Sequence, residues 1–290
     1  MKPQIIEKLG IMLLNHGFVV KQLTQTCFDL IARKERSIFL LKVLEDANAL
    51  SEVDAVEMMR VASYFGGSPL IIAEKASDPL EENVVYTRYG IFTLSPSTFS
   101  ASLDAKMPFI KRSHAGLTAH IKGEVLREVR EQHTLSLQAV SRRIGVSRRM
   151  ILKYEEDGVE MTLSKALKMY DLFGHEVFDK IDVFHHKVPV PDAHASPVAS
   201  KYVELGFEAT EAKRAPFNVI AKQGKELILT GVGDKPNKHL QSLSQLINAD
   251  NLVIFKKDKP KGIPAMTKRD FLEVERAGEL VKFLHDEKYL

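Results

Sequence analysis

Hydrophobic and polar positions in residues 136–155 follow the period of two short helices joined by a tight turn. Ser136 suits the N-cap of the first helix, because its hydroxyl can accept a hydrogen bond from a backbone amide in the first turn. Gly145 can adopt the positive φ of a helix end, and Ser147 can cap the second helix. The inward apolar positions are Leu137, Val140 and Ile144 in the first helix and Met150, Ile151 and Tyr154 in the second. This pattern predicts a helix-turn-helix.

The second helix of the motif carries cations on the positions that its apolar stripe leaves outward. Arg148 and Arg149 stand at its start, and Lys153 follows one turn later. Side chains at the start of such a helix reach base edges in the DNA major groove, and Arg can donate two hydrogen bonds to one guanine. We therefore expect a recognition helix at about residues 147–156. The residues expected to contact DNA are Gln138, Arg142, Arg143, Ser147, Arg148, Arg149 and Lys153.

Residues 126–173 resemble the DNA-binding domain of the phage-repressor and Cro family. The matching features are Arg127, Arg130 and Glu131 in the preceding helix, the Leu135-Ser136 entry, the Gly145-Val146-Ser147 turn and the closing Lys153-Tyr154-Glu155. The resemblance implies that the three outward cations of the second helix touch bases. The family often has Gln directly after the capping serine, where it touches the DNA backbone. Leu137 stands there in this chain, and Gln138 is the candidate to replace that contact.

The helical period continues on both sides of this motif and predicts a five-helix domain at residues 119–184. The other three helices are expected at about 120–132, at 163–173 and at 176–184, where Val177, Phe178 and Ile181 would close the core.

Positive charge is concentrated in and before the motif. Residues 111–153 contain ten Lys and Arg against three Asp and Glu, whereas residues 1–110 contain 11 against 13. A local net charge of about +7 is typical of a surface that binds a polyanion. Candidates to neutralise phosphates are Lys122, Arg127, Arg130, Arg142 and Arg143. Not all of these can face DNA. Arg127 and Arg130 lie on the first helix of the domain, and one of them could instead pair with Glu131 or Glu155.

The sequence pattern predicts an α/β domain at residues 1–104. Apolar periodicity indicates a helix at 2–16, strands at 18–23, 27–32 and 37–44, a helix at 52–65, strands at 69–73 and 89–94, and a short helix ending at residue 103. This order resembles the core of the PD-(D/E)-x-K nuclease superfamily.

The resemblance implies a Mg²⁺ site built from an Asp on the second strand and an acid-x-Lys pair on the third. Asp29 and Lys42 match that pattern, but the position of the second acid holds Leu40, which cannot ligate a hard cation. Glu35 and Glu45 are nearby in the sequence, at a turn and at a strand end. We therefore expect an inactive nuclease core and no enzymatic activity or cofactor, with Asp29 and Lys42 as a structural ion pair or as unrelated surface charges. A magnesium-dependent nuclease that uses them is the alternative.

Residues 199–290 repeat the first domain. Gly206-Phe207 precedes Phe217-Asn218 by 11 residues, which is the spacing from Gly17-Phe18 to Phe28-Asp29. At equivalent positions, Asn218 replaces Asp29 and Gly231 replaces Lys42, so the second copy has lost both groups. The expected fold class is α/β plus all-α, with two nuclease-like α/β domains flanking a five-helix repressor-type domain.

Residues 104–118 and 185–198 are predicted to be linkers, because they combine prolines with no helical or alternating period. His185, His186 and His194 in the second linker are expected to be exposed, since no Cys or close carboxylate pair completes a metal-ligand set. A single cysteine, Cys27, excludes an internal disulfide. The 290 residues contain no recognisable signal peptide or membrane span, and we expect a cytoplasmic protein.

The whole arrangement resembles a family of archaeal transcriptional regulators that carry a repressor-type helix-turn-helix within a longer chain. The implied function is sequence-specific binding of double-stranded DNA, by a homodimer on two half-sites about one helical turn apart. The α/β domains would supply dimer contacts, or they would sense an effector or a partner protein. Three alternatives stay open: RNA binding, an antitoxin-like partnership, and a helix-turn-helix that docks to protein with its arginines solvated.

Overall fold

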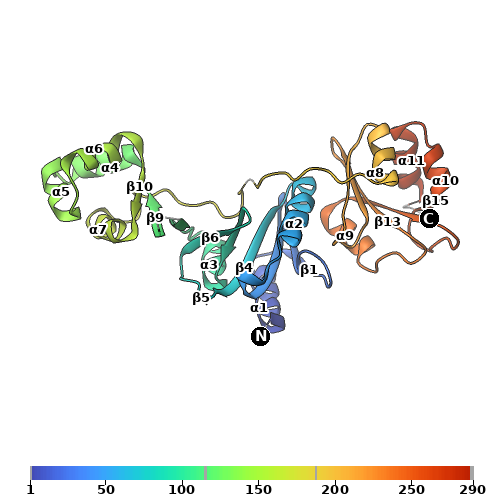
Figure 1. The fold of residues 1–290 in the computed structure, drawn as a ribbon, viewed down its shortest axis with the longest axis horizontal. Coiled ribbons are helices and arrows are strands. Elements are labelled where there is room, and N and C mark those ends of the chain that lie inside the picture. The colour runs from blue at the N-terminus through green and yellow to red at the C-terminus, as the bar shows by residue number, and fades with distance from the viewer. Residues whose placement is uncertain (1, 114–115, 187, 288–290) are drawn as a thin grey trace. The chain divides into compact units, whose positions relative to one another are not determined.

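The computed structural model describes residues 2–113, 116–186 and 188–287, with the helices and strands that Figure 1 shows. It divides into two compact units, which are Met1–Ile71, Tyr89–Ile91 and Lys187–Leu290 on the one hand and Ile72–Arg88 and Phe92–His186 on the other. Residues 114, 115 and 187, which fall in the two predicted linkers, lie outside the described residues. None of the described helices is both long and apolar enough to cross a membrane.

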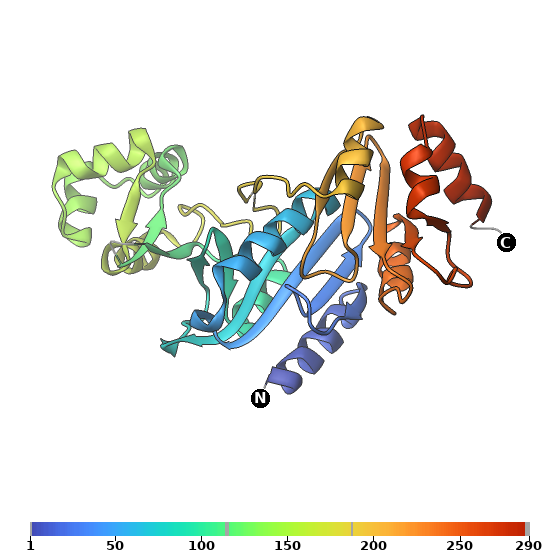
Figure 2. The same cartoon turned by 45° about the vertical axis from the view of Figure 1, so that its right-hand side comes forward.

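The first unit opens with a nuclease-like repeat, in which an antiparallel sheet β1-β2-β3 lies between helices α1 and α2 (Figure 2). Ser51 caps α2 by accepting a hydrogen bond from the Asp54 amide at 3.1 Å, and Gly66 ends that helix with φ +64°. Its elements are α1 (Lys2–Asn15), β1 (Val19–Gln22), β2 (Leu30–Lys34), β3 (Ser37–Asp46), η1 (Ala47–Ala49), α2 (Glu52–Phe65) and β4 (Ser68–Ala76), which leaves the unit after Ile71. This is the order that the apolar periods predicted.

The same unit contains the second nuclease-like repeat, a sheet ordered β11-β12-β13-β14-β15. Its first two pairings are antiparallel and its last two parallel. Helices α8 and α11 cover one face of this sheet and α9 the other (Figure 1). The elements are α8 (Pro197–Glu204), β11 (Glu208–Glu211), β12 (Val219–Gln223), β13 (Glu226–Val232), α9 (Leu240–Ile247), β14 (Asp250–Phe255), β15 (Ala265–Thr267), α10 (Lys268–Glu273) and α11 (Ala277–Glu287).

Backbone hydrogen bonds show that the two repeats are built alike. The amide of Asp29 donates to the carbonyl of Leu41 at 2.8 Å, and the amide of Asn218 donates to the carbonyl of Thr230 at the same distance. The pairs are 12 residues apart in both repeats, so the alignment of Asp29 with Asn218 that the sequence predicted is confirmed. Further along, Phe99 and Phe271 are both fully buried at matching positions of α3 (Pro96–Leu103) and α10.

The two repeats contact each other through matching elements. Arg33 at the end of β2 donates to the carbonyl of Leu246 in α9 at 2.9 Å, and Lys222 at the end of β12 donates to the carbonyl of Tyr64 in α2 at 3.2 Å. Arg33 and Lys222 are equivalent, four residues after Asp29 and Asn218. The two acceptors are also equivalent, each two residues before the left-handed residue that ends its helix. The contact therefore has an approximate two-fold symmetry.

The second unit combines strands with the helix-turn-helix bundle. Its elements are β5 (Asp78–Pro79), β6 (Val84–Arg88), most of β7 (Ile91–Leu94), α3, β8 (Ile110–Ser113), β9 (Gly116–His120), α4 (Gly123–Gln132), α5 (Leu137–Ile144), α6 (Arg148–Asp157), β10 (Glu160–Thr162) and α7 (Leu163–Phe173). Strand β8 pairs parallel with β6 and antiparallel with β9, which also pairs antiparallel with β10. The stretch predicted as a linker at 104–118 thus contains β8 and the start of β9.

The fifth helix predicted at residues 176–184 does not form. This segment satisfies its backbone groups against distant parts of the chain instead. The carbonyl of Val177 accepts from the Lys122 amide at 2.8 Å, and the amides of Asp179 and Ile181 donate to the carbonyls of His120 and Pro108 at 3.0 and 2.7 Å. Val177 and Phe178 are nevertheless buried in the core, as predicted. Apolar spacing identified the buried side chains, and tertiary pairing determined the backbone conformation.

Candidate nucleic-acid interface

The helix-turn-helix forms as its capping residues predict. The Ser136 hydroxyl accepts a hydrogen bond from the Ala139 amide, and the Ser147 hydroxyl accepts one from the Met150 amide, each at 3.1 Å. Gly145 ends α5 with φ +78°, a conformation that favours glycine. These caps fix where α5 ends and α6 begins, and so they fix which side chains of α6 face outward.

A common core holds α4, α5, α6 and α7 together. Val140, Ile144 and Ile151 are fully buried and Tyr154 nearly so, whereas Leu137 and Met150 are half-buried at its margin. Helix α4 approaches α6 so closely that a Cβ on Gly123 would lie 2.5 Å from the Glu155 carbonyl oxygen. Only glycine fits at this crossing, and sequence reasoning gave no sign of that requirement.

All seven residues predicted to contact DNA are exposed. Gln138 lies in the first turn of α5, Arg142 and Arg143 lie in its last turn, and Arg148 and Arg149 begin α6. Ser147, Arg149 and Lys153 line one hollow on the surface of α6, which Met150, Leu152 and Glu156 complete. The hydroxyl of Ser147 accepts its capping bond, so its own proton stays available to donate to an anion.

Two further cations lie beside the turn. The Lys165 amine donates to the carbonyl of Gly145 at 2.9 Å. A Cβ on Gly145 would lie 3.3 Å from the Lys165 amine and 3.7 Å from the Lys168 amine. Both lysines come from α7, one turn apart. Sequence reasoning missed them, although lysines three apart at the start of a predicted helix were the available signal.

Arg130 has a structural role rather than a role at the surface. It donates to both carboxylate oxygens of Glu155, at 2.6 and 3.0 Å, and to the carbonyl of Leu135 at 3.1 Å. The Glu155 side chain is 1% exposed, and its hydrogen bond raises the pKa of Arg130. Arg127 reaches the same carboxylate at 3.7 Å with its side chain 49% exposed. The sequence left open a phosphate contact or an ion pair with Glu131 or Glu155 for Arg130. Arg130 forms the ion pair, mainly with Glu155, and it also donates to Glu131 at 3.2 Å.

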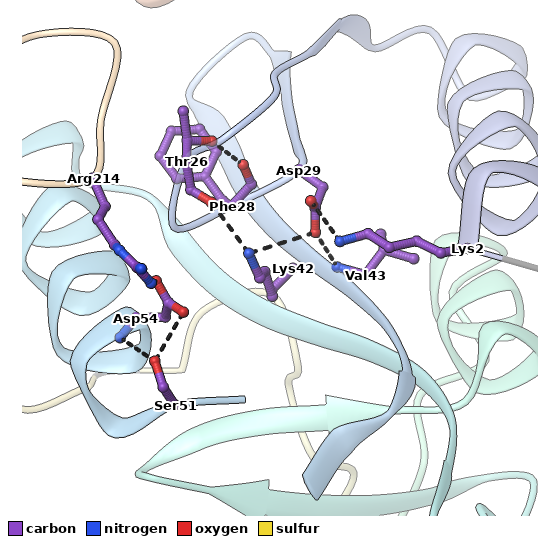
Figure 3. A network of polar contacts seen from close by, with 9 residues as sticks. All are labelled: Lys2, Thr26, Phe28, Asp29, Lys42, Val43, Ser51, Asp54 and Arg214. Carbon is purple, nitrogen blue, oxygen red and sulfur yellow. Dashed lines mark hydrogen bonds and ion pairs between the residues drawn. The ribbon is translucent and has the colours of Figure 1, made fainter. Parts of the chain in front are cut away.

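The nuclease-like position of the first repeat has the geometry of a structural ion pair (Figure 3). One oxygen of Asp29 accepts from the Lys2 amine at 2.8 Å, and the other accepts from the Val43 amide at 2.8 Å. The Lys42 amine is 3.9 Å from Asp29 and donates to the carbonyl of Thr26 at 3.1 Å. Both oxygens of the carboxylate are thus already engaged by the protein.

The other groups that a metal would need are missing or differently placed. Leu40 is fully buried, Glu35 lies in the β2–β3 turn with φ +53°, and Glu45 accepts from the Lys2 amide at 2.9 Å. Among the described residues, no group of three metal-ligating side chains includes Asp29. The residues present do not fit a Mg²⁺ site.

The second repeat keeps the structural hydrogen bond of that position without the charge. The Asn218 carboxamide oxygen accepts from the Val232 amide at 2.8 Å, as Asp29 accepts from Val43. Gly231 stands where Lys42 would be, and a Cβ there would lie 3.1 Å from the Leu240 side chain. Leu240 of α9 therefore occupies the space that a lysine would need.

The three linker histidines lie in different surroundings. His185 pairs with Asp182 at 2.8 Å, His186 stacks on Phe92 with ring centroids 3.7 Å apart, and His194 lies 3.8 Å from Glu57. His185 is exposed as predicted, whereas His186 and His194 are half-buried.

These features define a class: a helix-turn-helix protein that carries two nuclease-like repeats, in neither of which the described residues complete the Asp and acid-x-Lys set of a nuclease. Comparison with known proteins supports the first nuclease-like repeat and the helix-turn-helix. A family model for a PD-(D/E)XK superfamily domain matches residues 2–108, and a helix-turn-helix family model matches residues 126–174. No solved structure matches the chain.

Relatives from archaea cover nearly the whole chain. A protein of Methanoculleus marisnigri is 31% identical over 98% of this chain and 98% of its own length. A protein of Thermococcus gammatolerans is 30% identical over 89% of this chain and 87% of its own. Both are named "Putative HTH-type transcriptional regulatory protein". The chain belongs to the family of archaeal proteins that carry this name.

Proposed function

We propose that the chain is a sequence-specific regulator that binds double-stranded DNA with α6 in the major groove. The observation that carries this proposal is the exposure of Arg148, Arg149 and Lys153 on a helix fixed by two caps and a buried core. A rigid helix presents side chains to base edges reproducibly, and sequence recognition requires this.

The other predicted contacts have distinct roles in this proposal. Arg142 and Arg143 neutralise phosphates and set the register on the duplex, because they lie in the last turn of the preceding helix. Gln138 and Ser147 donate hydrogen bonds to the DNA backbone. Arg149 and Arg148 donate to guanine, where a good bidentate pair contributes roughly 1–3 kcal/mol of discrimination.

Two copies of the chain would bind two half-sites about one helical turn apart, since one helix-turn-helix covers few base pairs. The faces of α2 and α9 that join the repeats are used inside each chain. The homodimer would therefore form through other surfaces.

We further propose that the nuclease-like repeats do not cleave DNA. A plasmid-nicking assay with Mg²⁺ or Mn²⁺ should show no cleavage. Metal-dependent cleavage that Asp29→Ala abolishes would contradict this part of the proposal.

Selection of bound duplexes from a random pool, at two salt concentrations, tests the main proposal. A defined site is expected, together with a steep fall of affinity with salt. The control is Arg148→Ala combined with Arg149→Ala, which should abolish enrichment. Failure to enrich any duplex, or preference for single-stranded RNA over duplex DNA, would reject the proposal.

A further inference from the structure

Two loops of the second repeat carry a cluster of exposed lysines. One loop follows β13 and the other follows β14, and these strands are parallel neighbours, so the loops leave the same edge of the sheet. Residues 233–239 and 256–262 contain six lysines against two aspartates. Lys259 pairs with Glu287 at 3.4 Å. The other five are exposed and are here called the lysine edge: Lys235, Lys238, Lys256, Lys257 and Lys261.

A single aspartate joins the two loops. One oxygen of Asp234 accepts from the amides of Lys256 and Lys257, at 2.6 and 2.9 Å, and the amide of Gly233 donates to the carbonyl of Ile254 at 2.8 Å. The loops are thus held side by side. Asp234 binds main-chain amides of the second loop, which leaves the lysine amines directed to solvent.

The segment of the first repeat at the equivalent place, from the end of β3 to the start of α2, has the opposite charge. Val43 and Val232 are equivalent residues, because the Val43 amide donates to Asp29 and the Val232 amide donates to Asn218 at the aligned position. After Val43, residues 44–54 contain four acidic and no basic residues. After Val232, the chain runs directly into the lysine edge. At this position the second repeat has neither the carboxylate nor the amine of the first, because Asn218 and Gly231 stand where Asp29 and Lys42 do, so no carboxylate adjoins the lysine edge there.

The first repeat contributes one cation beside this edge. Burial lowers the pKa of His239, and the charges of Lys21 on β1 and of Lys238 lower it further. Strand β1 also contacts α9, so Lys21 lies near that helix, at whose start the first of the two loops ends.

We propose that the lysine edge binds the phosphate backbone of duplex DNA, as a second contact separate from the recognition helix. The class of ligand follows from charge. The lysine edge presents several flexible, positively charged side chains, and the adjoining strand position has no carboxylate, so this surface suits a polyanion. Lysines on loops neutralise phosphates without reading bases, so this contact adds affinity but no sequence preference. The choice of DNA as the polyanion rests on the proposed function.

The test uses the full chain and a short duplex of unselected sequence, with affinity measured across a salt series. Lys256→Ala combined with Lys257→Ala should weaken binding, and it should reduce the slope of log affinity against log salt by about two units, since each phosphate contact contributes about 0.9. Selection from a random pool should return the same site as the native chain. The matched control is Lys225→Ala with Lys282→Ala, two exposed lysines in the β12–β13 turn and on α11. This control should leave the slope unchanged.

The same substitutions in a chain with an altered recognition helix distinguish this proposal from the proposed function. In a chain with Arg148→Ala and Arg149→Ala, the Lys256/Lys257 change should still reduce the salt slope. If the Lys256/Lys257 change reduces the salt slope although the native chain selects no DNA site, the proposal for the lysine edge is supported and the proposed sequence-specific function is rejected. An unchanged slope in both backgrounds, an equal loss in the control variant, or tighter binding of single-stranded RNA than of duplex at this edge would overturn the proposal.

Discussion

Arg33 and Lys222 occupy the same position in the two nuclease-like repeats, and each donates a hydrogen bond to the helix of the other repeat. The repeats thus pair as two subunits of a symmetric dimer would, although they belong to one chain. The same contact includes Phe65 and Phe217, whose ring centroids are 6.1 Å apart, and the ion pair of Asp54 with Arg214.

The ion pair between Asp54 and Arg214 should make the pairing of the repeats sensitive to acid. Burial opposes ionisation of Asp54, but hydrogen bonds from Arg214 and Ser51 outweigh it and hold its pKa below the ordinary value of 3.8. A depressed folded-state pKa contributes stability that is fully present above pH 3.8 and is lost as the pH falls through the lower, folded-state value.

The melting temperatures of the native chain and of Arg214→Ala should therefore differ by a few degrees at pH 7 and converge as the pH falls below 3.8 and through the lowered pKa of Asp54. Lys213→Ala is a suitable control, because Lys213 contacts Glu57 through its backbone amide, which the substitution keeps. A gap between the curves that is constant with pH would show that Asp54 is not the group responsible.

Asp29 should be replaceable by asparagine but not by alanine. Asn218 shows that a carboxamide can accept the hydrogen bond of the strand amide at 2.8 Å. Asp29→Asn should keep that bond, whereas Asp29→Ala leaves the buried Val43 amide without its acceptor, which costs about 1–3 kcal/mol. Thermal unfolding of the full chain measures both. Equal destabilisation by the two changes would mean that the charge of Asp29, rather than its hydrogen bond, stabilises the repeat.

Arg130→Ala should loosen the helix-turn-helix bundle. It leaves the Glu155 carboxylate buried without its main partner, and breaking a buried pair in this way costs about 3–5 kcal/mol. Hydrogen exchange of the α4 and α6 amides in the full chain reports this local stability. Arg127→Ala is the matched control: its side chain is half-exposed at 3.7 Å from the same carboxylate, so its loss should cost at most about 1 kcal/mol. Similar exchange rates in the two variants would contradict the role given to Arg130.

Arg149→Ala and Arg143→Ala should affect DNA binding differently. Arg149 lines the hollow on α6, so its loss should relax the preference among duplex sequences. Arg143 lies in the last turn of α5, and its loss should weaken all duplexes about equally and flatten the salt slope by about one unit. Selection from a random pool, with salt titration of one duplex, distinguishes these outcomes. The assignments would be wrong if Arg143→Ala changed the selected site or Arg149→Ala did not.

Local signals in the sequence predicted most of the secondary structure. Ser136, Gly145 and Ser147 act through backbone groups within a few residues, and each caps or ends the helix that was expected. The duplication was also predictable, since equal spacings survive in both copies. The candidate DNA contacts followed from the outward positions of a helix whose inward positions are apolar.

What the sequence could not predict depends on residues that are distant along the chain. The carbonyl that Arg33 binds belongs to Leu246, and Val177 pairs its backbone with Lys122 in place of a fifth helix. The requirement for glycine at position 123 arises only when α4 meets α6. The hydrophobic period describes one helix or strand at a time. Contacts between residues that are distant along the chain therefore cannot be predicted from it.

The pairing of two repeats within one chain has an evolutionary consequence. In a dimer of identical subunits, every substitution appears on both sides of the axis, so a lysine gained on one side is gained on the other. Covalent linkage removes that constraint. In this single chain, the repeat with Asp29 has an acidic margin at residues 44–54, while the repeat with Asn218 has lysines at the corresponding margin. A dimer of identical subunits could not differ between its two halves in this way.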